Sequence, residues 1–315
     1  MASPLVVAPA VAADRTQYVV ISFDGAGPIS QWERSRALAR ETGAEFTYFL
    51  SCVFLLTPQT KDAYAGPRHG MGKSNVGFAA SRDDVAARLR QIWVARMEGH
   101  EIASHGCGHF DGGEWTAAEW RDEFRSFADI LRDAWTINGI AYEPRDWRRF
   151  AASEVTGFRA PYLSTNASMF AALAAENYAY DASGVSRGPS QPKPGAVRAF
   201  ALPLIPEGPA AKPIIAMDYN LFVRHSGGFE KPSEAAAFEE RTYRAFIGAF
   251  REQFHGKRIP LQLGFHFTLM NDGAYWRALE RFAREACTQP EVRCVSYAGL
   301  LAATDNANGS HAAAD

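Results

Sequence analysis

The sequence lacks a strong charge imbalance, a long apolar run and any internal repeat. Its 315 residues carry 33 Lys and Arg against 35 Asp and Glu, a formal net charge of −2. This balance gives no electrostatic basis for binding nucleic acid or an anionic membrane surface. No run approaches the roughly 18 apolar residues that indicate a transmembrane helix. Because no low-complexity tract or linker separates two cores, the sequence predicts one domain.

Cysteine is scarce, with four residues in the chain. An even number permits disulfides without requiring them. Cys287 and Cys294 bracket a short loop, and Cys52 and Cys107 each follow a predicted strand. A Cys52–Cys107 bridge would brace the loop that contains Cys107. The alternative is four free thiols in a cytosolic protein.

The N-terminal segment is apolar and rich in small residues. It contains Ala10-Val-Ala12 shortly before polar residues, and so resembles the end of a secretory signal with an A-x-A site, although a basic region is missing. The alternative is an ordinary N-terminal extension. We expect a periplasmic or secreted protein. We divide the chain into a signal remnant or flexible segment (1–15), a domain (16–303) and a flexible tail (304–315).

Strand-like and helical patterns alternate along the chain. This alternation predicts an α/β fold with a mainly parallel sheet or barrel. Residues 57–80 are rich in Gly, Pro and Lys and predict a long loop. The predicted strands are 18–23, 45–50, 101–105, 157–161, 201–204, 214–220, 261–267 and 292–297. The predicted helices are 30–41, 82–98, 116–137, 167–177, 232–254 and 274–286.

Polar side chains follow four of the predicted strands. Asp24 ends the first strand, His105 the third, Arg159 the fourth, and His266 follows Leu261-Gln-Leu-Gly-Phe265. Reactive groups of such folds collect at the carboxyl ends of parallel strands. His109 lies four residues after His105, and two neutral imidazoles at this spacing suit Zn²⁺ or a similar ion. Each residue alone also fits a structural ion pair or a buried histidine.

Taken in order, these segments resemble the polysaccharide deacetylase family, the NodB-homology group or carbohydrate esterase family 4. The resemblance covers about residues 16–303 and is strongest to the chitin-deacetylase-like branch. It implies a single-domain distorted (β/α)7-type barrel. The motifs that carry it are Ser22-Phe-Asp-Gly25, Gly99-His-Glu-Ile-Ala-Ser-His105 through His109, Phe158-Arg-Ala-Pro-Tyr162 and Leu263-Gly-Phe-His266.

The resemblance also implies residue roles. Asp24 matches the general base, Arg159 the arginine that pairs with it, and His266 the general acid. His105 and His109 match the metal-binding histidines. Tyr162 lies where the family supplies a backbone N–H to the oxyanion. These roles fit the chemistry of amide hydrolysis, which needs a base for the attacking water and an acid for the leaving amine.

One position departs from the family pattern. The metal-ligating Asp that directly follows the base is Gly25 in this chain. Three interpretations stay open. Asp24 itself binds the metal, another carboxylate does, with Asp218 the first candidate and Asp111 the second, or the site has lost metal or activity.

The leading functional hypothesis is a metal-dependent N-deacetylase of a GlcNAc-containing polymer such as chitin, peptidoglycan or an exopolysaccharide. The expected cofactor is a divalent metal, Zn²⁺ first and Co²⁺ or Mn²⁺ second. The expected partner is an N-acetylated glycan, without nucleic acid or a membrane span. The alternatives are a glycan-binding protein without catalysis and an amidohydrolase acting on a small non-sugar amide.

Overall fold

The computed structural model describes residues 16–312, with side chains described through residue 306. The prediction of a cleaved signal concerns residues 1–15, which lie outside this range. Within the described residues, no helix is long and apolar enough to cross a membrane.

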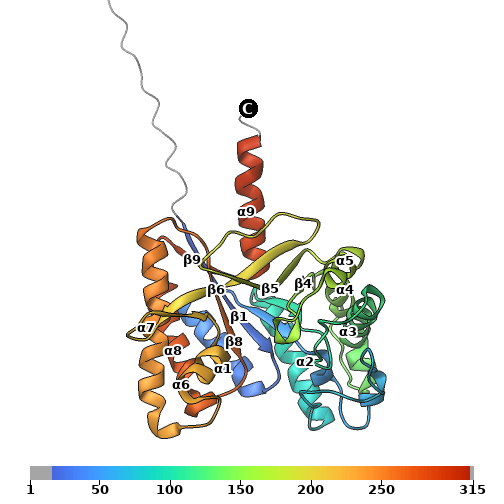
Figure 1. Cartoon of the computed structure of the whole chain (residues 1–315). Coiled ribbons are helices and arrows are strands. Elements are labelled where there is room, and N and C mark those ends of the chain that lie inside the picture. Colours follow the sequence, from blue (N-terminus) through green and yellow to red (C-terminus); the bar gives the residue numbers. More distant parts are fainter. Residues whose placement is uncertain (1–15, 313–315) are drawn as a thin grey trace, which may run out of the picture.

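The architecture is an α/β barrel of distorted (β/α)7 type, as the sequence predicts. Helices surround a curled central sheet (Figure 1). The strands are β1 (Gln17–Gly25), β2 (Thr47–Leu50), β3 (Glu101–Ser104), β4 (Gly157–Phe158), β5 (Tyr180–Ser186), β6 (Arg198–Glu207), β7 (Lys212–Ile215), β8 (Leu261–His266) and β9 (Val292–Val295). The α-helices are α1 (Ile29–Thr42), α2 (Arg82–Met97), α3 (Ala117–Ile137), α4 (Trp147–Ser153), α5 (Ala167–Ala175), α6 (Asp218–Ser226), α7 (Ala235–His255), α8 (Met270–Ala286) and α9 (Tyr297–Ala312).

The sheet order brings sequence-distant strand ends together. It runs β7-β6-β5-β4-β3-β2-β1-β8, and β9 also pairs with β1. All pairs are parallel except β6 with β7. A parallel bridge between Met217 and Gly264 links the segment after β7 to β8, so the two ends of the sheet meet. Parallel pairing places the carboxyl ends of β1, β3, β4 and β8 on one rim.

Capping explains where two of the predicted helices begin. The Ser81 side chain accepts the Asp84 backbone N–H at the start of α2. Thr116 and Glu119 form a reciprocal capping box at the start of α3. In both cases the cap satisfies backbone donors that the first helical turn leaves unpaired.

The structure differs from the sequence prediction in several elements. The strand β5 and the helix α4 were not predicted. Residues 214–220 were predicted to be one strand, but β7 ends at Ile215 and α6 begins at Asp218. Helix α9 extends through Ala312, into the segment expected to be a tail, and projects away from the body of the molecule (Figure 1).

The four cysteines form two disulfides, which settles the choice that the sequence leaves open between bridges and free thiols. Cys52 bonds to Cys107 across 55 residues of sequence, and Cys287 bonds to Cys294 across 7. Cys52 begins the short 3₁₀ helix η1 (Cys52–Leu55), which closely follows β2. The first bridge therefore ties η1 to the turn between His105 and His109, which we call the histidine turn (residues 105–109).

Candidate active site

The candidate site lies on the rim formed by the carboxyl ends of β1, β3, β4 and β8. Asp24 and His266 are register partners on the adjacent strands β1 and β8. Ser104 and Phe158, which directly precede His105 and Arg159, are register partners on β3 and β4. The predicted residues thus come together because four parallel strands end at the same level.

Asp24 and Arg159 form a buried ion pair. An Arg159 Nη1–H donates to Asp24 Oδ1 at 2.7 Å, and neither side chain is more than 3% exposed. Burial alone would raise the pKa of Asp24, but the charges of Arg159, His105 and His266 outweigh it and hold this pKa below its usual value. Asp24 is therefore an ionised carboxylate at neutral pH.

Arg159 is fixed by further contacts that the sequence does not reveal. Its Nε donates to the Ala182 carbonyl at 3.0 Å, Nη1 to Ser22 Oγ at 2.9 Å and Nη2 to Tyr297 Oη at 2.9 Å. Its guanidinium also lies over the Phe49 ring, 4.3 Å from the centroid. A buried arginine with this many partners has one orientation, and it directs one N–H at Asp24.

The two histidines of the motif face each other. Their ring centroids are 5.1 Å apart, with planes inclined at 63°. His105 Nδ1 lies 2.8 Å from the Arg159 carbonyl oxygen, which makes Nδ1 the protonated nitrogen and leaves Nε2 with a free lone pair. Burial lowers the pKa of His105 to about 3. Burial also lowers the pKa of His109, and its Nδ1 is a buried atom without a hydrogen-bond partner among the described residues.

These two neutral imidazoles are the residues that a divalent cation would contact, but the described residues do not complete a site. No group of three or more His, Cys, Asp or Glu side chains in the described range is placed to hold a metal ion. Position 25, at the end of β1, is glycine. Asp111 is exposed and accepts the Gly113 N–H at 2.9 Å. The donor set thus falls short of the usual three protein ligands, and we assign no step to a metal.

Asp218, predicted as a possible metal ligand, lies against His266. Its Oδ1 is 2.7 Å from His266 Nδ1, and its Oδ2 accepts the His266 backbone N–H at 2.8 Å. Burial lowers the pKa of His266, but the Asp218 carboxylate outweighs burial and holds this pKa above its usual value. The sequence did not reveal this pairing, because 48 residues separate the partners.

Tyr162 closes one side of the site. It follows Pro161 in the 3₁₀ segment η3 (Pro161–Leu163) and adopts a left-handed conformation, with φ of 58°. Its side chain is 60% exposed, and its ring lies 4.7 Å from the His109 ring. The exposed Tyr219 ring lies 6.0 Å from the His266 ring. Two accessible aromatic rings therefore flank the histidines and Asp24.

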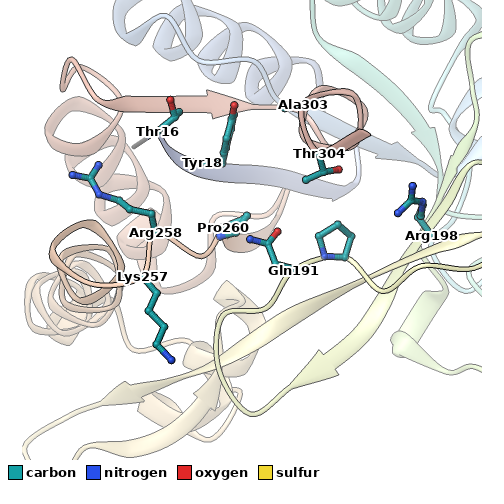
Figure 2. Close-up of a pocket in the computed structure, with 10 residues that line it drawn as sticks. Thr16, Tyr18, Gln191, Arg198, Lys257, Arg258, Pro260, Ala303 and Thr304 are labelled. Atoms are coloured by element: carbon teal, nitrogen blue, oxygen red, sulfur yellow. The ribbon is translucent and has the colours of Figure 1, made fainter. Parts of the chain in front are cut away.

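A separate cavity lies at the other end of the barrel (Figure 2). Its volume is about 420 Å³, and it is lined by residues near the starts of β1, β6 and β8. None of the site residues predicted from the sequence is among those that line it. The named lining residues in Figure 2 are Thr16, Tyr18, Gln191, Arg198, Lys257, Arg258, Pro260, Ala303 and Thr304.

Comparison with known proteins identifies the fold. A scan with protein-family models finds no match, and a search of curated proteins finds none either. Among solved structures, a protein assigned as a polysaccharide deacetylase from Mycobacterium smegmatis superimposes with a TM-score of 0.57 at 17% identity, covering 93% of this chain and 92% of that chain. One so assigned from Pseudomonas aeruginosa PAO1 gives 0.55 at 14% identity, covering 91% and 90%.

A third solved structure, Puue allantoinase, superimposes with a TM-score of 0.53 at 15% identity, covering 91% of this chain and 90% of that chain. At these identities the comparisons define the fold. The chain has the NodB-type fold of polysaccharide deacetylases, and the resemblance noted in its motifs is confirmed at that level.

Proposed function

We propose that this chain, on its polysaccharide-deacetylase fold, is a hydrolase that removes N-acetyl groups from a GlcNAc-containing polysaccharide. Chitin, peptidoglycan and exopolysaccharides share the acetamido group that it would cleave. The observation that carries the proposal is the pair Asp24 and His266 on adjacent strand ends. Arg159 favours the ionised form of Asp24, and Asp218 favours the protonated form of His266.

The two residues divide the proton transfers of amide hydrolysis. Asp24 accepts a proton from the water that attacks the acetyl carbon, and Arg159 keeps the carboxylate ionised and oriented. His266 donates a proton to the leaving amine, and Asp218 stabilises its imidazolium form. Two titratable groups whose surroundings move their pKa values in opposite directions are the usual arrangement for a base and an acid at one site.

The remaining residues shape the space between the base and the acid. The Tyr162 backbone N–H is assigned to the oxyanion that develops on the acetyl oxygen. The rings of Tyr162 and Tyr219 offer apolar faces for sugar rings. A divalent cation, expected as Zn²⁺, Co²⁺ or Mn²⁺, remains a prediction that rests on His105 and His109 alone. Metal analysis of the purified protein tests it.

Two buried disulfides support the prediction of a periplasmic or secreted protein, because such bonds persist in oxidising compartments. Fractionation of the native host, followed by immunodetection, tests this localisation. Recovery of the protein in the cytoplasmic fraction alone would contradict it.

A second candidate is a glycan-binding protein without catalysis. Gly25 favours it, because glycine replaces the expected metal-ligating Asp and the described residues offer no group of three metal ligands. The two candidates share a substrate surface and differ in acetate release.

The test is an acetate assay on a substrate panel. Purified protein with added Zn²⁺, Co²⁺ or Mn²⁺ is incubated with chitooligosaccharides, peptidoglycan fragments and small non-sugar amides. We expect acetate from at least one glycan. Glycan binding without acetate release would establish the second candidate. Hydrolysis of the small amides alone would move the function to an amidohydrolase of another substrate class.

A further inference from the structure

The histidine turn has a strained backbone that needs external support. His109 has a φ of 55°, and Gly106 in the same turn has a φ of 67°. The left-handed region is unfavourable for a residue with a side chain. Such conformations persist where the surroundings over-determine them. The direction of the His109 ring therefore depends on whatever fixes the backbone of residues 106–108.

A buried glutamate on α3, Glu123, accepts a hydrogen bond from the backbone of the histidine turn. The Cys107 backbone N–H donates to Glu123 Oε1 at 2.6 Å. Tyr64, from the long loop after η1, donates its hydroxyl to Glu123 Oε2 at 2.8 Å and accepts the Gly108 N–H at 3.0 Å. Glu123 is 2% exposed and Tyr64 is fully buried. Two consecutive backbone donors of the turn thus end on one carboxyl–phenol pair.

Further hydrogen bonds hold the carbonyl groups of the histidine turn. The Gly106 carbonyl accepts the Cys52 N–H at 3.1 Å, and the Gly108 carbonyl accepts the Asn75 N–H at 2.8 Å. The Asn75 side chain donates to the His109 carbonyl at 3.1 Å. A Cβ on Gly108 would lie 2.4 Å from the Phe110 ring and 2.7 Å from the Tyr64 hydroxyl, so only glycine fits against this support.

We propose that Glu123, acting with Tyr64, is the positioning residue that sets the backbone of the histidine turn and thereby the direction of the His109 ring. Glu123 touches neither His105 nor His109 directly. It acts through the Cys107 and Gly108 N–H groups, which lie between the two histidines in sequence. Its kinetic consequence rests on the proposed function, and its structural consequence does not.

The chain offers a matched control. Glu101, at the start of β3, is also buried and accepts the Tyr180 hydroxyl at 2.8 Å and the Ala298 backbone N–H at 3.0 Å, and it accepts the Thr47 hydroxyl at 2.8 Å as well. Glu101 lies at the opposite end of β3 from the histidine turn. Glu101→Gln therefore removes a comparable buried carboxylate that makes no hydrogen bond to the histidine turn, Asp24 or Arg159.

The experiment compares Glu123→Gln with Glu101→Gln, and Tyr64→Phe with Tyr180→Phe. For acetate release from the best glycan of the panel, we expect Glu123→Gln and Tyr64→Phe to lower kcat roughly ten- to a hundredfold with KM within about twofold, because a small misplacement of a site group costs this much. The two control variants should keep kcat within about twofold. Equal kcat in both sets would overturn the proposal.

A second readout is independent of activity. We expect the imidazole resonances of His109 in heteronuclear NMR spectra to move in Glu123→Gln and to stay in place in Glu101→Gln. Unchanged His109 resonances in a folded Glu123→Gln protein would overturn the positioning role. If the unmodified protein releases no acetate, the proposed function fails, and this spectrum still decides the role of Glu123.

Discussion

At the scale of single residues, two carboxylates of the site have different roles: Asp24 is the proposed base, and Asp218 is the partner of the proposed acid, His266. Asp24 is held ionised by Arg159, with the two atoms 2.7 Å apart. Asp218 lies 2.7 Å from the His266 ring and favours its protonated form. The first shift lowers the pKa of a carboxyl, and the second raises the pKa of an imidazole. Activity should rise as Asp24 loses its proton and fall as His266 loses its own.

Replacing Asp218 by Asn tests whether Asp218 supports His266 as the general acid. The carboxylate raises the pKa of His266, so its removal lowers this pKa. The alkaline limb of the pH profile of kcat should therefore move to lower pH. The maximum should fall by less than the roughly 10²- to 10⁴-fold that general acid catalysis contributes, because the His266 imidazole itself remains. An alkaline limb at an unchanged pH would show that His266 is not the acid.

Gly25→Asp tests the missing ligand. A Cβ at position 25 would meet only the Phe54 ring, at 3.8 Å, so the side chain has room. The φ of 84° at position 25 costs a non-glycine residue about 1–2 kcal/mol. We expect Zn²⁺ affinity to rise at least about tenfold, because a third, anionic donor joins two imidazoles.

The control for Gly25→Asp is Gly43→Asp at the end of α1. Gly43 has a similar φ of 71°, and a Cβ there meets nothing within 4 Å. Chelator competition measures Zn²⁺ affinity in both variants. Equal affinity in Gly25→Asp, Gly43→Asp and the unmodified protein would mean that His105 and His109 do not form part of a metal site.

The sequence predicts that Asp24, Arg159 and His266 lie together, and the family resemblance predicts the pairing of Arg159 with Asp24. The other partners of these side chains could not be predicted. Asp24, His105, Arg159 and His266 each come at the end of a strand-like pattern, which can be recognised in the sequence. The contact of Asp218 with His266 cannot be recognised there, because it depends on how α6 packs beside β8. The Arg159 contacts to Ala182 and Tyr297 could not be predicted either, because they depend on how β5 and the start of α9 lie beside Arg159 in the fold.

At the scale of elements, the Cys52–Cys107 bridge ties η1 to the histidine turn. It closes a 55-residue segment, whereas Cys287–Cys294 closes one of 7. In the chain-entropy description, the longer loop gives the larger stabilisation, about 4 kcal/mol against about 2 kcal/mol. Replacing each pair by serines and measuring urea unfolding checks this order. A larger loss from the Cys287 and Cys294 pair would contradict it.

Elements with a clear apolar pattern were predictable, and others were not. The strands β1 and β8 contain buried apolar runs, β3 is a short buried strand with two apolar residues, and the Ser81 and Thr116 caps mark the starts of two helices. Strand β5 reads Tyr-Asp-Ala-Ser-Gly-Val-Ser, which lacks such a run, and its pairing with β6 contains an irregularity between Asp181 and Gly184. Its strand conformation comes from its neighbours in the sheet.

At the scale of the whole molecule, the barrel separates two ends. The carboxyl ends of β1, β3, β4 and β8 carry the proposed chemistry, and the cavity of Figure 2 lies at the opposite end. The alternation of strands and helices predicts this fold class. The closure of the sheet through Met217 and Gly264 was not predictable, because it joins residues 47 positions apart outside any regular pair of strands.

The most direct test of the central claim is acetate release from an N-acetylated glycan by the unmodified protein and by Asp24→Asn. Asparagine keeps the size of the side chain but cannot accept the proton of the attacking water. We predict release by the unmodified protein and a loss of roughly 10²- to 10⁴-fold in kcat for the variant, with its fold intact by circular dichroism. Equal release by both proteins would contradict the account.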